Sequence, residues 1–442
     1  MNKFAPLVEF NHLKTEVRRN NNILLIGIDI AKRNHVCSFE LTSGQILRKA
    51  FRFSNDLNGF QMLIDKINSY RQQHQVDQVI CGLEATATYW KPLALHLASE
   101  GLYVVLVSTL AVKQNRQTID VSKDKNDAKD AHNICDLMAQ GKFQYLNIRK
   151  GAVAELSRLF RIRFGLTKEK AKIRIKLRQI LGDIFPELEA HFKDMLGATA
   201  LALLKQYPFP NDILELGVEP LTQLIKAASH HRLGKNKALA IYALAQQSVG
   251  IDIEGEAVRF ELQLLLKNLA GLLADLKATE NKIVNIIQHD KNYSLLLSIK
   301  GIGPVIAAGL IGEIGNINWY ASAKELTKLA GLDLWSNNSG DSIRSGKHIS
   351  KKGRKYLRTI AYEAAINCVR CNPQFKAKYQ QLLDNQARRK KIKSIAYVAI
   401  ADKVLRMVFR MLKDGKPYDP NYDNILKERY RCKKNKFQHN SQ

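Results

Sequence analysis

The first hundred residues alternate between extended apolar runs and helix-like stretches. Residues 23–30 (ILLIGIDI) are almost all apolar and β-branched, which predicts a buried central strand. Extended runs at 35–41 and 46–53, split by a Ser-Gly turn, predict two antiparallel strands beside it. The pattern then predicts a helix over 57–73, a strand over 77–83, a helix over 90–99 and a strand over 103–107.

Four carboxylates stand where these elements meet. Asp29 is the one charge in the first strand, and Glu84 follows the strand over 77–83. Asp127 and Asp130 are three residues apart, so they share one helix face. The strand order is that of a ribonuclease-H-like α/β sheet, which would bring all four acids together. Four carboxylates suit a pair of Mg²⁺ (or Mn²⁺) ions beside a phosphodiester.

The run around Asp127 has an alternative interpretation. Acids and lysines alternate in VSKDKNDAKDAHNICDLMAQGK, as they do on a solvated helix. Asp29 is harder to explain in that way, because a carboxylate inside an apolar strand is costly to bury without a partner.

The middle of the chain, residues 151–290, has a helical pattern. Residues 152–181 place an apolar stripe opposite many Arg and Lys side chains, and residues 256–288 carry a near-continuous leucine seam. The seam predicts either a coiled coil with a partner helix or a core helix pair within one protomer. The periodicity does not separate the two.

Two glycine-containing segments mark the last part, residues 291–442. The run 295–312 (LLLSIKGIGPVIAAGLIG) predicts helix, glycine hairpin, helix; Lys300, Gly301 and Gly303 would let backbone N–H groups approach a phosphate. A glycine turn between two core helices has the same pattern. Downstream, the loop at 335–355 places serines among cations that include Arg344, Lys347, Lys351 and Lys352. Such a loop grips phosphate, or activates a serine for attack on phosphorus.

Charge narrows the class of partner. The 442-residue chain has a formal net charge of +28, and residues 341–442 hold 26 Lys and Arg against 8 Asp and Glu. The cluster Arg388, Arg389, Lys390 and Lys391 contributes to this excess, which favours binding to a polyanion. Six scattered cysteines do not form a disulfide framework in a chain this long. With no apolar run of transmembrane length and no signal-peptide core, we expect a cytoplasmic protein with no membrane partner.

Three short motifs resemble those of a known family. Gly27–Lys32, Gly82–Thr86 and Lys125–Ala131 are similar to the motifs of the DEDD transposases, the insertion-sequence family numbered one hundred and ten, which includes the Piv DNA invertases. The resemblance spans most of the chain. It implies a RuvC-like domain over 1–150, a helical coiled-coil linker over 151–290, and a mostly α carboxy-terminal transposase domain with a helix-hairpin-helix-like element over 291–442.

The resemblance also implies a mechanism. In this family the serine of a Ser-Gly pair in the carboxy-terminal domain is the covalent nucleophile, and it corresponds to Ser339. Target and donor DNA are selected through a non-coding bridge RNA, and protomers assemble as a homodimer and then a tetramer around composite sites. We therefore expect a bacterial or archaeal DNA transposase or site-specific recombinase. A RuvC-like junction nuclease without serine chemistry and a non-enzymatic nucleic-acid scaffold are the alternatives.

Overall fold

The computed structural model describes residues 7–84, 89–119, 127–146, 148–251, 255–335, 338–339, 342–343, 348–384 and 392–420. Contacts divide the chain into two compact units, which are described separately: residues 1–149 with 318–321, and residues 150–317 with 322–442. Within the described residues, no helix combines the length and apolar character needed to cross a membrane.

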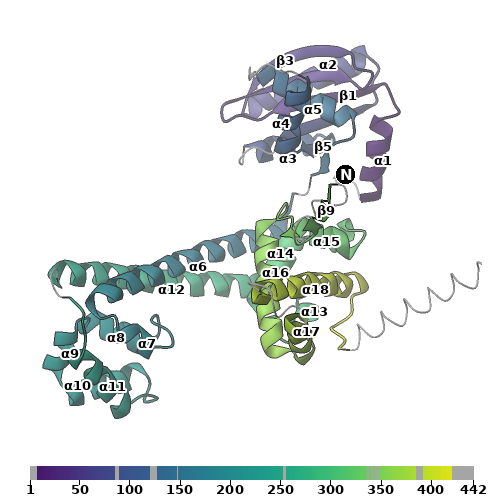
Figure 1. The fold of residues 1–442 in the computed structure, drawn as a ribbon. Helices are drawn as coiled ribbons and strands as arrows, with labels where there is room; N and C mark the ends of the chain where they lie inside the picture. Colours follow the sequence, from purple (N-terminus) through teal and green to yellow (C-terminus); the bar gives the residue numbers. More distant parts are fainter. Residues whose placement is uncertain are drawn as a thin grey trace, which may run out of the picture. The chain divides into compact units, whose positions relative to one another are not determined.

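The first unit is a mixed α/β domain (Figure 1). Its elements are α1 (Leu7–Val17), β1 (Ile23–Asp29), β2 (Asn34–Leu41), β3 (Ile46–Ser54), α2 (Leu57–Gln73), β4 (Gln78–Glu84), α3 (Trp90–Ser99), β5 (Tyr103–Val107), α4 (Thr109–Ile119), α5 (Asp127–Ala139) and β6 (Gln144–Tyr145). The strands form one sheet in the order β3-β2-β1-β4-β5-β6. β1 is antiparallel to β2 and parallel to β4, which agrees with the ribonuclease-H-like order expected from the sequence.

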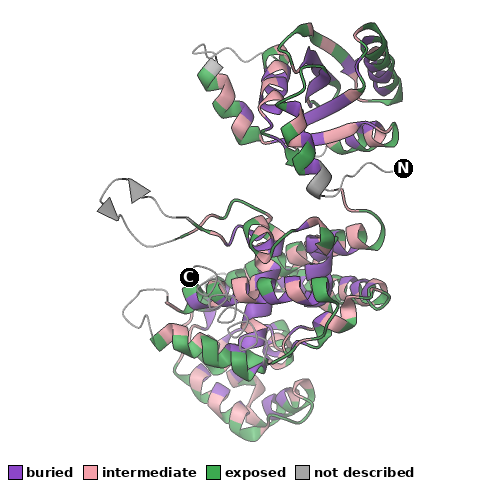
Figure 2. Cartoon of the chain, turned by 90° about the vertical axis from the view of Figure 1, so that its right-hand side faces the viewer, coloured by how far each residue is buried: buried purple, intermediate pink, exposed green. Residues whose placement is uncertain are grey.

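The sheet is buried on both faces, because side chains alternate between them along each strand. Leu24, Ile26 and Ile28 of β1 pack in one cluster with residues of α2 and α3. Ile23 and Leu25 pack in the other cluster with residues of α1, α4 and α5. Figure 2 shows the buried residues along the strands and on the inner sides of the covering helices. This double cover explains why β1 is a continuous apolar run rather than an alternating one.

The second unit is mostly helical. Its helices are α6 (Gly151–Ile184), α7 (Leu188–His191), α8 (Ala198–Gln206), α9 (Pro210–Leu216), α10 (Val218–Ala228), α11 (Lys235–Gln246), α12 (Gly255–Ile287), α13 (Tyr293–Leu297), α14 (Pro304–Ile314), α15 (Ala323–Ala330), α16 (Lys355–Cys371), α17 (Pro373–Asp384) and α18 (Ile392–Asp414). Four two-residue strands, β7 (Leu334–Trp335), β8 (Asn338–Ser339), β9 (Ser342–Ile343) and β10 (His348–Ile349), interrupt them, and η1 (Ile317–Trp319) follows α14.

The helices α6 and α12 lie side by side within this chain (Figure 1). They are antiparallel, since Lys176 near the end of α6 pairs with Glu261 near the start of α12 at 2.6 Å, and Arg163 pairs with Glu280 at 2.7 Å. Of the two alternatives for the leucine seam, the core helix pair within one protomer is therefore present. A coiled coil between protomers stays a prediction.

Cysteines lie in the core of the α/β unit. Cys37 on β2 and Cys81 on β4 are buried, and burial raises the pKa of the Cys81 thiol to about 12. The five cysteines in the described part of the chain are free thiols.

The fold predicts that a side chain is tolerated differently at two paired glycines, Gly27 of β1 and Gly82 of β4. A Cβ at Gly27 would lie 2.2 Å from the backbone oxygen of Ala131, whereas one at Gly82 would meet the flexible side chain of Met138. We expect Gly27→Ala to lower the free energy of unfolding by about 1–3 kcal/mol. The backbone of Ala131 cannot move aside to make room for the added methyl group as a flexible side chain can. Gly82→Ala is the matched comparison, and it should cost less in the same denaturant titration. Equal costs would contradict the close backbone approach.

Candidate active site

Asp29 and Glu84 end two neighbouring strands. β1 and β4 are parallel and in register up to Ile28 and Leu83, so the two acids occupy the next position on each strand. Glu84 is buried and Asp29 is partly buried. Both acids therefore lie at the carboxyl edge of the sheet centre, where the sequence predicted them.

The two glycines fix which way these acids face. Gly27 precedes Asp29 by two positions and Gly82 precedes Glu84 by two, so each glycine shares a sheet face with its acid. That face carries α5: the N–H of Gly27 donates to Sγ of Cys135 at 3.0 Å, and the missing Cβ atoms leave the space in which α5 lies. The acids consequently face the side of the sheet that α5 covers.

The direction of α5 brings its first turn to the same edge. Ala131 and Cys135 lie over Gly27, while Sγ of Cys135 also lies 3.8 Å from the oxygen of Leu25. α5 thus runs in the opposite direction to β1. The start of α5 therefore lies toward the end of β1 that carries Asp29. The predicted acids of the helix, Asp127 and Asp130, belong to that first turn.

Arginines accompany both helix acids. Asp127 is exposed, and its carboxylate lies 4.0 Å from Nη2 of Arg52 on β3. Asp130 is buried, with only 3% of its surface exposed, and forms an ion pair with Arg116 of α4. Because a buried carboxylate without a partner is costly, Arg116 stabilises Asp130 in this position.

The spacing of the four acids bears on metal binding. Among the residues that the structure describes, no three His, Cys, Asp or Glu side chains are close enough together to hold a metal ion. The four side chains are nevertheless of the right chemical type for a metal ion, because carboxylate oxygens are ligands that Mg²⁺ prefers. The structure therefore brings the acids to one edge, and the metal site itself stays a proposal.

Sequence reasoning missed a buried polar group under α5, paired with Leu25 and therefore four strand positions away from Asp29. Glu40 of β2 is buried and accepts hydrogen bonds from Oγ of Ser38 at 2.5 Å and from Nδ1 of His132 of α5 at 2.8 Å. The hydrogen bond to Glu40 raises the pKa of His132 above its ordinary value. This contact ties α5 to β2. The signal was present, because Ser38 and Glu40 are two polar residues on one face of a strand whose other central residues, Val36, Cys37 and Phe39, are apolar.

The residues between β7 and β10 form the serine loop, and this loop has a fixed base. β7 pairs antiparallel with β10 through Leu334–Ile349 and Trp335–His348, which closes the loop. Within it, β8 pairs with β9, and Ser339 lies opposite Ser342. Lys351 and Lys352, which follow β10, are exposed. Arg344 and Lys347 lie outside the described residues, as do Arg388, Arg389, Lys390 and Lys391.

The glycine turn before α14 has a packing role. Gly301 has a φ of 107°, and a Cβ there would lie 2.7 Å from the backbone of Asn367 in α16. Gly303 is the N-cap of α14, and no atom lies within 4 Å of the position its Cβ would take. Gly301 is thus explained by packing and backbone conformation, whereas Gly303 leaves the start of α14 open beside the exposed Lys300.

Comparison with known families accounts for both parts of the chain. A model described as a DEDD transposase of IS110 type matches residues 26–186, which contain the four acids. A second model, of transposases of the IS116/IS110/IS902 family, matches residues 293–380, which contain the serine loop. The chain belongs to this transposase family. It is therefore an enzyme of DNA strand cleavage and transfer.

Individual relatives of this transposase extend over most of the chain. An uncharacterized protein of insertion element IS116 from Streptomyces clavuligerus is 26% identical over 89% of this chain and 96% of the relative. A transposase for insertion sequence IS1328 from Yersinia enterocolitica is 23% identical over 78% of this chain and 83% of its own. A pilin gene-inverting protein from Moraxella bovis is 24% identical over 89% and 97%. The relatives of this chain thus include a protein named as a transposase and one named as a gene-inverting protein.

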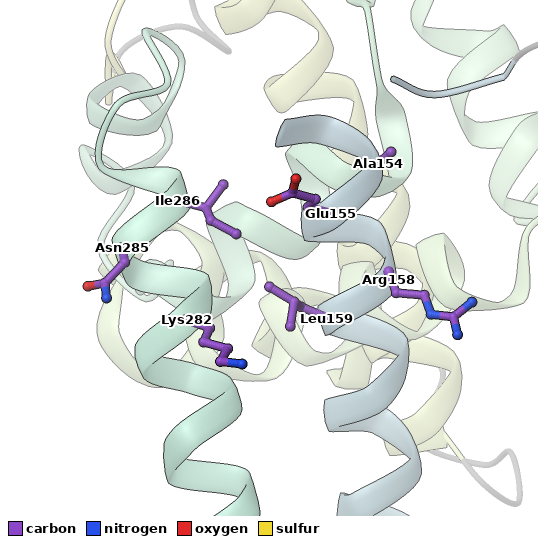
Figure 3. Close-up of a pocket in the computed structure, with 7 residues that line it drawn as sticks. All are labelled: Ala154, Glu155, Arg158, Leu159, Lys282, Asn285 and Ile286. Atoms are coloured by element: carbon purple, nitrogen blue, oxygen red, sulfur yellow. The ribbon is translucent and has the colours of Figure 1, made fainter. Parts of the chain in front are cut away.

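The transposase also has a pocket in its helical unit, between α6 and α12 (Figure 3). It has a volume of about 550 Å³ and contains no predicted site residue; Figure 3 shows Leu159 and Ile286 turned toward each other across it. Its lining is Ala154, Glu155, Arg158, Leu159, Lys282, Asn285 and Ile286. Because the lining contains none of the candidate acids or serines and lies between two packed helices, we interpret the pocket as a gap in helix packing rather than a site of phosphodiester chemistry.

Proposed function

We propose that this transposase cuts and rejoins DNA with two groups of residues: the acids Asp29, Glu84, Asp127 and Asp130, and the nucleophile Ser339. The observation that supports this best is the meeting of two strand ends and the first turn of α5 at one sheet edge. Mg²⁺ or Mn²⁺ bound by the four acids would act as a Lewis acid on a phosphate oxygen. The position of Ser339 in a closed hairpin loop supports its role as a presented nucleophile.

The chemistry conserves the number of phosphoester bonds. The Ser339 hydroxyl attacks phosphorus, an Oγ–P bond forms, the bond from phosphorus to the departing DNA oxygen breaks, and that oxygen takes up a proton. A DNA hydroxyl then attacks the phosphoserine ester, which restores Ser339 and joins the strand. Lys351 and Lys352, exposed beside the loop, would offset phosphate charge during both steps. No external energy source is needed, because each broken ester is replaced by another.

The partners follow from charge and from the family. Transposases act on DNA, and a formal net charge of +28 suits a protein that binds phosphates without reading bases. We propose that a non-coding bridge RNA pairs with target and donor DNA and supplies most of the sequence choice. We also propose a homodimer that assembles into a tetramer in the bacterial or archaeal cytoplasm. In that assembly the acids of one protomer and the Ser339 of another would form composite sites.

A second candidate is a junction nuclease that uses the acids alone. The observation that favours it is the separation of the acids and Ser339 into different compact units of the chain. Such an enzyme would release free DNA ends and form no covalent intermediate. Detection of a covalent adduct between the protein and a DNA end would therefore distinguish the recombinase from the nuclease.

The acids give the first functional prediction. Asp29→Asn and Glu84→Gln keep the size of each side chain and remove its charge, so we expect strand cleavage to fall by at least about 100-fold, with nucleic-acid binding largely intact. Glu100→Gln, which changes an exposed acid of the same unit, is the control. A gel assay of cleavage with and without chelator measures this. Cleavage that persists in either variant, or in excess chelator, would overturn the metal assignment.

Ser339 gives the second functional prediction. Stalled reactions should contain protein joined to a DNA end, and Ser339→Ala should abolish both this adduct and strand exchange. Ser342→Ala is the matched control, since Ser342 lies opposite Ser339 in the same small hairpin. Peptide mapping of the adduct locates the ester. Normal recombination by Ser339→Ala, together with a parent enzyme that forms no adduct, would leave the nuclease function.

The carboxy-terminal cations give the third. Neutralising Arg388, Arg389, Lys390 and Lys391 should reduce the slope of log K against log salt by roughly 3 to 4 if each contacts a DNA phosphate. The control removes four cations of α6 that pair with acids in the structure: Lys172, Arg174, Lys176 and Arg178. Their removal should change the slope little. Equal slopes for the parent and the 388–391 variant would show that this cluster does not contact nucleic acid.

A further inference from the structure

Glu313 is a buried carboxylate in the apolar helix α14. None of its surface is exposed, and it is the one charged residue between Lys300 and Lys324. A carboxylate in such surroundings destabilises the fold unless it is paired and hydrogen-bonded. Its partners on α6 are Oγ of Ser157 at 2.8 Å and Nε of Arg161 at 3.2 Å. The helices also approach closely here, because a Cβ at Gly312 would lie 2.7 Å from the backbone of Ser157.

The same residue is bonded to the segment that follows the serine loop. Nη1 of Arg354 donates to the backbone oxygen of Glu313 at 2.7 Å, and Arg354 is the N-cap of α16. Arg161 adds a second link, since its guanidinium lies 4.9 Å from the ring centre of Tyr356 in the first turn of α16. Glu313 thus joins α6, α14 and the start of α16.

The start of α16 is in turn bound to the base of the loop. The N–H of Arg354 donates to the oxygen of Leu329 at 2.6 Å, and the N–H of Lys351 donates to the oxygen of Gly331 at 3.0 Å. Oγ of Ser350 donates to the carboxylate of Asp333 at 2.5 Å. These bonds hold the chain after β10 against the chain before β7. Because β7 and β10 close the loop, a shift of Arg354 would move both of its ends.

We propose that Glu313 is a positioning residue that fixes the base of the loop carrying Ser339, through Arg161 on its carboxylate and Arg354 on its carbonyl oxygen. The inference rests on the proposed function, because it takes Ser339 as the nucleophile. Glu313 and Arg354 act through the loop and not on DNA. Their loss should lower the rate of attack on phosphorus and leave DNA affinity unchanged.

The test measures the rate of adduct formation at saturating DNA, where differences in affinity cancel. Arg354→Gln removes the donor to Glu313, and its matched control is Lys355→Gln, which removes the same charge from the next, exposed residue. We expect Arg354→Gln to slow adduct formation by about 10- to 100-fold, with the half-saturating DNA concentration unchanged. Lys355→Gln should leave the saturated rate within about threefold of the parent, and the conservative Arg354→Lys should restore part of it.

Glu313→Gln keeps an acceptor for Ser157 and removes the charge that faces Arg161, so it should also slow adduct formation at saturation. Thermal midpoints identify any variant that fails to fold, and in that case the two Arg354 variants decide. Equal losses from Arg354→Gln and Lys355→Gln, or a change in affinity alone, would overturn the positioning role while Ser339 remains the nucleophile. A parent enzyme without any adduct would instead overturn the proposed function, and this inference with it.

Discussion

The close approach of α5 to β1 and β4 is the contact on which the candidate acid site depends. It is possible only because Gly27 and Gly82 stand side by side on neighbouring strands, where no side chain separates the helix from the sheet. The same two-residue offset from glycine to acid places Asp29 and Glu84 on the face that α5 covers. The glycines therefore allow the close approach of the helix, and the alternation of side chains along the strands directs the acids to the same face.

Much of the α/β unit could be predicted from periodicity alone. The runs over 57–73, 90–99 and 103–107 coincide with α2, α3 and β5, because long apolar stripes and β-branched runs specify element type locally. The placement of Asp29 and Glu84 followed from the strand order. The ion pair of Asp130 with Arg116 could not be foreseen, since it depends on how two different helices pack together, which no local pattern fixes.

The helical unit shows the limit of pattern reasoning more clearly. The leucine seam of α12 could pack against a helix of the same chain or of another protomer. Only the antiparallel pairing with α6 shows that part of the seam packs within the chain. Gly301 proved to be a packing residue, because its backbone conformation and its contact with α16 both exclude a side chain. Glu313 carried a readable signal, a lone carboxylate in an apolar helix, but its partners come from distant segments.

Charge has different uses in different parts of this chain. Several cations of α6 pair with acids of neighbouring segments, so part of the positive charge on this helix is already offset within the chain. Around the base of the serine loop the exposed cations include Lys324, Lys328, Lys351 and Lys352. Phosphate binding depends on cations that water and DNA can reach, so the arrangement favours the loop over the long helix as a site of contact with nucleic acid. The acids of the α/β unit would repel DNA phosphates, and the divalent cation proposed above would reconcile these carboxylates with a DNA substrate.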